Sequence, residues 1–157
     1  MMKRFFLLAA VSMAITGAAA AHDFKGGGVT VGHPWSRPAA VGSNGVGFMS
    51  LTNTGATPVT FVSVSSPGSA GAVAHRTQSV GGVYSMAPAP NLVIKAGETV
   101  TFAPGGYHLM FTGLKAPLTP GGKLPATLTF KRGAAKIVLP VTFTVQASRP
   151  AASGHNH

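Results

Sequence analysis

Short runs of alternating apolar and polar residues recur along most of the chain, bounded by Gly, Pro, Ser or Asn. Val, Thr, Ile and Phe dominate these runs, and long amphipathic helix patterns are missing after residue 22. The pattern predicts strands at residues 29–33, 47–53, 59–65, 72–78, 83–86, 99–104, 107–113, 126–130 and 136–145. Strands at this spacing, with turn residues between them, indicate an all-β fold built as an antiparallel β-sandwich or barrel.

The segments between these runs predict hairpin loops at residues 53–55, 81–82 and 131–133. Pro140 lies inside the last run, where it cannot donate a backbone hydrogen bond, so we expect an edge strand or a bulge there. No internal repeat is present in the sequence. We therefore expect one domain, residues 22–147, followed by a flexible histidine-containing tail at 148–157.

The first 21 residues have the features of a secretory signal peptide: basic Lys3 and Arg4, an apolar run from Phe5 to Ile15, and a series of small residues. We expect cleavage after Ala21 and export to the periplasm. We expect no stable membrane insertion, because no other segment approaches the run of about 18 apolar residues that spans a bilayer. A retained signal anchor is the alternative.

Composition narrows the chemistry that the chain can perform. The formal net charge is +10, or +8 once Lys3 and Arg4 are removed. Asp23 and Glu98 are the only acids and cysteine is absent, so most hydrolytic mechanisms, calcium or magnesium sites and thiolate ligands are disfavoured. The Lys and Arg residues are scattered without interleaved aromatic residues, so we expect no nucleic-acid partner.

The segment GGYHLM, residues 105–110, places His108 and Met110 two positions apart in a predicted strand. Residues i and i+2 of a strand point to the same face, so these two side chains share one. A lone histidine or methionine in a strand is more often a surface or core residue than a ligand. Met49 has no such neighbour and is expected to fill the core.

A second pair of this kind depends on the turn at Gly81–Gly82. With a two-residue turn, Thr77 lies opposite Met86, and His75 and Met86 share a face as diagonal neighbours. A three-residue turn would shift the parity and separate them. If the sandwich brings the two pairs together, two imidazoles and two thioethers form a His₂Met₂ site. These soft, neutral ligands suit Cu(I).

The spacing H-x₁₀-M-x₂₁-H-x-M at His75, Met86, His108 and Met110 resembles the signature of the periplasmic PCu(A)C copper chaperones. The segments GHPWSR, FMSLTN, GGYHLMFTGLKAPL and LPATLTF are similar to that family as well. The resemblance covers roughly residues 27–145 and implies a cupredoxin-like β-sandwich that binds one Cu(I) at a shallow, exposed site. Arg76 follows His75 where some members have a methionine, and we expect a solvated surface arginine.

The resemblance also implies a carrier that is not an enzyme. It would pass copper toward the dinuclear CuA centre of cytochrome c oxidase, with subunit II or a Sco-type assembly factor as the receiving partner. We expect a monomer. A different function stays open, namely an exported basic β-sandwich that acts in adhesion or binds polyanions without metal.

Three further histidines lie near the ends of the chain. Cleavage after Ala21 would expose the amine and imidazole of His22, and the tail carries His155 and His157. Either end is a candidate for a secondary Cu(II) site, because imidazoles without thioethers suit Cu(II). A copper oxidase or monooxygenase with a histidine brace at His22 is a further alternative. That brace needs a second histidine, which the sequence does not identify.

Overall fold

The computed structural model describes residues 22–89 and 91–147, which form eleven β-strands. The strands are β1 (Phe24–Gly26), β2 (Val29–Ser36), β3 (Gly45–Asn53), β4 (Val59–Ser65), β5 (Ser69–Val80), β6 (Val83–Pro88), β7 (Leu92–Ile94), β8 (Thr99–Phe102), β9 (Tyr107–Leu114), β10 (Lys123–Arg132) and β11 (Ala135–Val145). Within these residues no helix has the length and apolarity to cross a membrane. The all-β prediction is confirmed. The predicted signal peptide and tail lie outside the described residues.

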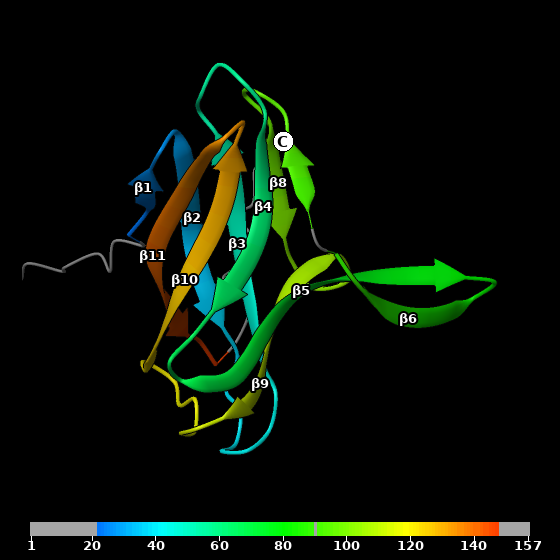
Figure 1. Cartoon of the computed structure of the whole chain (residues 1–157). Coiled ribbons are helices and arrows are strands. Elements are labelled where there is room, and N and C mark those ends of the chain that lie inside the picture. Colours follow the sequence, from blue (N-terminus) through cyan, green and yellow to red (C-terminus); the bar gives the residue numbers. More distant parts are fainter. Residues whose placement is uncertain (1–21, 90, 148–157) are drawn as a thin grey trace, which may run out of the picture.

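The strands follow one continuous hydrogen-bonded path in the order β6-β5-β9-β8-β3-β2-β11-β10-β4-β7, with β1 paired to β2. This path folds over on itself, so that β4, β10 and β11 lie across β2, β3 and β8 as two layers (Figure 1). All pairings are antiparallel except two short ones, β2 with β11 and β8 with β9. The molecule is therefore a mostly antiparallel sandwich with two short parallel contacts that the sequence pattern did not predict.

The apolar core lies between the two layers because each strand turns one alternate set of side chains inward. In β10 this set is fully apolar and buried, and it consists of Leu124, Ala126, Leu128 and Phe130. The ring of Phe61 in β4 packs edge-on against Phe130, with centroids 5.5 Å apart, and against Phe102 in β8 at 6.1 Å. Met49 is 2% exposed, so its predicted place in the core is confirmed.

All nine predicted strands are present, although most are longer than predicted, and the structure adds the three-residue strands β1 and β7. The predicted hairpin loop at 81–82 is confirmed, since Val80 pairs with Val83. The loop between β10 and β11 lies at residues 133–134, just after the predicted position, because Arg132 still pairs with Ala135. Strand β11 lies between β10 and β2 rather than at an edge of the sheet. Because β2 pairs with it only at Thr144 and Val145, Pro140 has Thr127 of β10 as its one partner and breaks no second ladder.

The predicted hairpin at residues 53–55 is wrong, because β3 does not pair with β4. The Asn53 side chain is fully buried and donates to the carbonyl oxygens of Thr57 and Ile94, at 2.8 and 3.0 Å. Its Oδ1 accepts a hydrogen bond from the backbone N–H of Gly55 at 3.0 Å. Asn53 therefore stabilises a crossing between the two layers, a role for which a turn-forming residue is equally suited.

The β5–β6 hairpin is the part of the fold that extends beyond the sandwich (Figure 1). Strand β9 pairs with β5 only as far as Arg76, so beyond that point β5 has β6 as its partner strand. Gly81 and Gly82 form the loop with φ values of +59° and +80°, the left-handed region that a two-residue hairpin turn requires. We call residues 77–86 the arm.

Candidate metal centre

Strand β9 carries the first pair of candidate ligands. It lies between β5 on one side and β3 on the other, and Leu109 and Phe111 are 0% exposed within the core. By the alternation of a strand, His108 and Met110 point to the opposite face. His108 is nevertheless only 5% exposed, whereas Met110 is partly exposed. Strand β9 thus holds one deep and one accessible candidate ligand.

The second histidine lies directly opposite the first. His75 of β5 pairs with His108 of β9 in the antiparallel register, and their ring centroids are 5.7 Å apart with an interplanar angle of 74°. The sequence predicted that the sandwich would bring two separate strand ends together. Instead, the two histidines belong to neighbouring hydrogen-bonded strands of one sheet, where directly opposed side chains share a face.

The two methionines flank this histidine pair. Thr77 lies opposite Met86, as the two-residue turn predicted, so Met86 is a diagonal neighbour of His75 on the same face. Met110 lies opposite Val73, which makes it the diagonal neighbour of His75 on the other side. Met86 is 60% exposed at the base of the arm. The register of β6, β5 and β9 therefore places all four predicted side chains on one face, which we call the metal face.

Two ring nitrogens in this cluster are buried without a hydrogen-bond partner, Nδ1 of His75 and Nε2 of His108. Nδ1 of His108 lies 3.3 Å from the carbonyl oxygen of Gly106. Because a carbonyl can only accept, Nδ1 carries the proton in this contact and Nε2 keeps its lone pair. A buried nitrogen lone pair without a partner is costly in a folded protein, and metal ligation removes that cost.

The electrostatics of the cluster also favour a neutral imidazole at His75. Burial lowers the pKa of His75 below its ordinary value of 6.5, and the neighbouring charge of His108 lowers it further. The Sδ atom of Met110 accepts a weak hydrogen bond from the side-chain amide of Asn44, at 3.9 Å. Neither contact was predicted. The one from Asn44 joins residues 66 positions apart, whereas the one to Gly106 lies within the turn that precedes β9.

The donor set suits a soft monovalent cation. Imidazole nitrogens and thioether sulfurs are neutral ligands, and thioethers select Cu(I) over harder ions. Across residues 22–89 and 91–147, no group of three or more His, Cys, Asp and Glu side chains could hold a metal ion. At the histidine pair, the two methionines are therefore the remaining candidate ligands.

Arg76, which follows His75, lies on the opposite face of β5. The guanidinium carbon of Arg76 sits 5.3 Å from the centroid of the Tyr107 ring, a cation–π contact on the face away from the two histidines. The side chain is exposed, as predicted, but it is oriented by the aromatic ring rather than free in solvent.

His22 is exposed and precedes β1, while His155 and His157 lie outside the described residues. Phe24 pairs with Val31, so the same register, continued by two residues, leads from His22 to His33. A Cβ placed on Gly32 would lie 3.7 Å from Oδ1 of Asp23, which supports that continuation. His33 is exposed and has a φ of +46° at a bulge in β2. This extrapolated register makes His33 a candidate for the second histidine that a brace at His22 would need.

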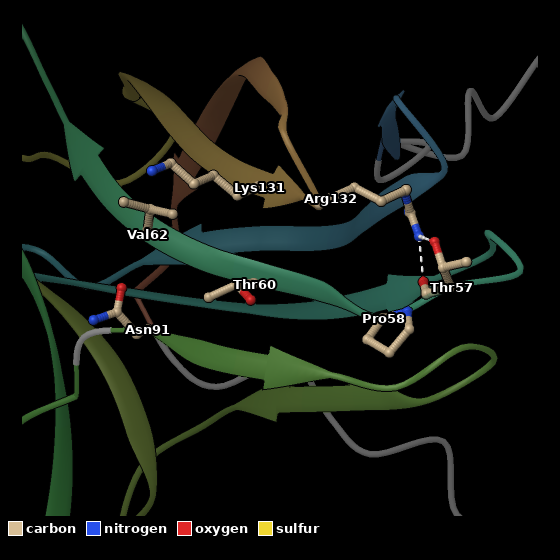
Figure 2. Close-up of a pocket in the computed structure, with 8 residues that line it drawn as sticks. Thr57, Pro58, Thr60, Val62, Asn91, Lys131 and Arg132 are labelled. Carbon is tan, nitrogen blue, oxygen red and sulfur yellow. Dashed lines mark hydrogen bonds between the residues drawn. The ribbon is translucent and has the colours of Figure 1, made fainter.

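A hollow of about 820 Å³ lies elsewhere, on the outer face of β4 and β10 (Figure 2). The side chain of Arg132 points across it and donates hydrogen bonds to Thr57. The same guanidinium also donates to the Gly27 and Gly28 carbonyls and to Oδ1 of Asn53. None of the residues that line this hollow belongs to β5, β6 or β9, so the hollow adds no ligand to the metal face.

The chain is similar to known proteins in sequence and in fold. A family model described as "LpqE-like: Putative lipoprotein LpqE-like" matches residues 29–146. A "Putative lipoprotein" of Leifsonia xyli subsp. xyli is 35% identical over 116 residues, covering 73% of this chain and 69% of that protein.

Two solved structures extend the comparison. The apo PCuAC domain from PmoF1 is 26% identical with a TM-score of 0.64, covering 81% of this chain and 100% of that one. CuI-DR1885 from Deinococcus radiodurans is 31% identical with a TM-score of 0.54, covering 74% of this chain and 78% of that one. The chain is homologous to PCuAC domains and shares their cupredoxin-like β fold, as the sequence predicted.

Proposed function

The chain belongs to the LpqE-like family, and we propose that it is an exported copper carrier that binds one Cu(I) through His75, Met86, His108 and Met110. Homology to PCuAC domains, one of them solved with Cu(I), supports a role in handling copper. The neutral donor set supports Cu(I) as the bound ion. The chain carries copper as cargo and is not an enzyme.

One observation supports this ligand set above the others. Nδ1 of His75 and Nε2 of His108 are both buried without a hydrogen-bond partner, and they belong to directly opposed residues. A purely structural histidine pair would satisfy its ring nitrogens with backbone or side-chain groups. Cu(I) between the two rings accepts both lone pairs, and the flanking thioethers of Met86 and Met110 complete a four-ligand site.

The exposure of the ligands suggests how copper leaves. Met86 is 60% exposed and His108 only 5% exposed, so an incoming ligand reaches the Met86 side first. Each ligand of the carrier can then be replaced in turn, with His108 released last. Such stepwise exchange transfers the ion without releasing free copper and needs no proton to leave the thioethers.

We further propose that the protein acts as a monomer in the periplasm, after cleavage of the signal peptide behind Ala21. The receiving partner is a copper-binding protein of the same compartment. In this proposal it is subunit II of cytochrome c oxidase, which holds the CuA centre, or a Sco-type assembly factor. Intact mass of the exported protein tests the cleavage site, since processing after Ala21 gives a chain that begins at His22.

A Cu(I) competition assay with a chromogenic chelator tests the site itself. His108→Ala and Met110→Ala should each weaken Cu(I) binding at least about tenfold, or about 1.4 kcal/mol, because each removes one of four ligands. His33→Ala is the matched control, since His33 lies outside the metal face and should leave Cu(I) affinity unchanged. Circular dichroism confirms that each variant is folded.

Unchanged Cu(I) affinity in both ligand variants would disprove the proposed site. Absence of Cu(I) binding by the wild-type protein would instead favour a metal-free role, such as polyanion binding by the basic surface.

A further inference from the structure

The arm carries most of the large hydrophobic side chains that are exposed in the described residues. Seven large hydrophobic residues are exposed in the described residues, and four of them lie on the arm. These four are Val80, Val83, Tyr84 and Met86, with exposed fractions of 74%, 69%, 78% and 60%. The other three, Val41, Val93 and Val138, are scattered over separate elements. Clustered exposed apolar residues mark an interaction surface more often than scattered ones do.

The arm divides these residues between its two faces. Ser79 pairs with Tyr84 and Thr77 with Met86, so Tyr84 and Met86 share the metal face with His75. Val80 pairs with Val83 on the opposite face, near the tip. Tyr84 therefore lies two residues beyond a proposed copper ligand, on the same face and fully accessible from outside.

A two-stranded ribbon has little stability of its own when no layer covers it. Four exposed apolar side chains on such a ribbon do not contribute to the sandwich core. Their exposure is understandable if a partner covers them during part of the working cycle. A partner that takes copper must approach Met86, and approach to Met86 brings it onto the arm.

Charge indicates what kind of partner fits. The described residues contain only two acids, Asp23 and Glu98, and neither lies on the arm. At the base of the arm, Arg76 is exposed and oriented by Tyr107. Bound Cu(I) adds a positive charge that the four neutral ligands do not compensate. A complementary partner therefore presents carboxylates around the apolar cleft that receives the arm.

We propose that the arm docks the copper-receiving protein, whose apolar cleft closes around the arm. One wall of the cleft covers Tyr84 and Met86, and the other covers Val83 and carries carboxylates that face Arg76. This inference rests on the proposed function, because it assigns the surface through which the same site delivers its ion. Tyr84 acts as the anchor, since a large aromatic side chain at the centre of a small interface carries much of the binding energy.

Transfer kinetics test this surface separately from copper affinity. Cu(I)-loaded wild type, Tyr84→Ser, Val83→Ser and Val138→Ser are each mixed with the soluble domain of cytochrome c oxidase subunit II and with a Sco-type factor. Val138 is 54% exposed on β11, so Val138→Ser is the matched control for Val83→Ser. A small Cu(I) chelator serves as an acceptor that cannot dock on the arm.

We expect Tyr84→Ser to slow transfer to the better protein acceptor about tenfold, because it removes the anchor. Val83→Ser should slow it less and Val138→Ser should have no effect. Cu(I) affinity and transfer to the chelator should be unchanged in all three variants. Transfer from the wild type to the protein acceptor should also slow as salt is raised, because salt screens the contact between Arg76 and the partner's carboxylates.

Two results overturn the docking proposal while leaving the copper site intact. One is transfer by Tyr84→Ser and Val83→Ser at the wild-type rate. The other is a wild-type protein that passes copper no faster to either protein than to the chelator at equal concentration. A wild-type protein that binds no Cu(I) in the competition assay overturns the proposed function and this inference together.

Discussion

The β10–β11 hairpin and the β5–β6 hairpin each reverse direction through a two-residue loop, at residues 133–134 in the first and 81–82 in the second. Strand β10 alternates buried and outward side chains almost to its end, because β4 lies beside it and the other layer lies beneath it. Strand β5 loses this alternation after Ala74, and Gln78 to Val80 are all exposed. The two hairpins have loops of the same length, but only the β10–β11 hairpin is packed against the other layer.

This difference separates two uses of apolar residues within one fold. In β10 the apolar residues are buried and hold the layers together, and their burial contributes to the free energy of unfolding. On the arm, Val83 and Tyr84 are exposed and contribute little to that free energy. Their location next to a proposed copper ligand is better explained by recognition of another molecule than by folding.

Paired substitutions should make the contrast measurable as stability. Phe130→Ala in β10 should lower the free energy of unfolding by about 3–5 kcal/mol, because it leaves a cavity beside Phe61 in a closely packed core. Val83→Ser on the arm should change it by less than about 0.5 kcal/mol, because Val83 is largely exposed already. Urea unfolding followed by circular dichroism measures both values. Comparable losses in the two variants would mean that the arm is part of the cooperative fold.

The β5–β6 register could be predicted from sequence only on the condition that Gly81–Gly82 forms a two-residue turn, which then fixes every opposed pair along the hairpin. The pairing of Val80 with Val83 meets that condition. Strands β1 and β7 were missed because three residues are too few to show an alternating pattern. The prediction of a hairpin at residues 53–55 was wrong because the same residue types, Asn and Gly, favour a hairpin turn and a loop between layers. Local chemistry determines a hairpin, but it does not decide which strands pair at a distance.

The candidate site likewise combines local features that the sequence predicts with a long-range pairing that it does not. The shared face of His108 and Met110 follows from strand periodicity, and the diagonal of His75 and Met86 follows from the turn. The direct opposition of His75 and His108 could not be predicted, since it depends on how β5 and β9 pair across a long separation in the chain. Whether the four side chains bind copper stays a prediction.

The pH dependence of Cu(I) binding tests whether His75 and His108, which lie opposite each other next to the arm, are ligands. Protonated imidazole cannot ligate, so affinity should fall as pH decreases. Because the pKa of His75 lies below 6.5, His75 keeps its lone pair at neutral pH and proton competition there begins only in more acidic solution. We expect nearly constant affinity from pH 7 to 8 and a fall toward pH 5 of up to about tenfold per pH unit for each titrating histidine.

Competition titrations at fixed pH values, with a chelator calibrated at each pH, measure this profile. The thioethers of Met86 and Met110 do not titrate, so part of the affinity should persist at pH 5. A control profile for His33→Ala should match the wild type. An affinity that does not vary between pH 5 and 8 would show that the metal is held without the histidines.

The smallest expected effect concerns Cu(II) at the ends of the chain, far from both hairpins in sequence. Deleting residues 148–157 removes His155 and His157. We expect this deletion to remove a weak Cu(II) signal and to leave Cu(I) binding intact. The reason is that imidazoles alone suit Cu(II), whereas thioethers suit Cu(I). His22 and His33, which the register of β1 and β2 brings toward each other, are the competing source of that signal. Electron paramagnetic resonance during Cu(II) titration of the full-length, truncated and His33→Ala proteins distinguishes the two. Identical spectra and stoichiometry with and without the tail, combined with loss of the signal in His33→Ala, would assign Cu(II) to the amino-terminal pair.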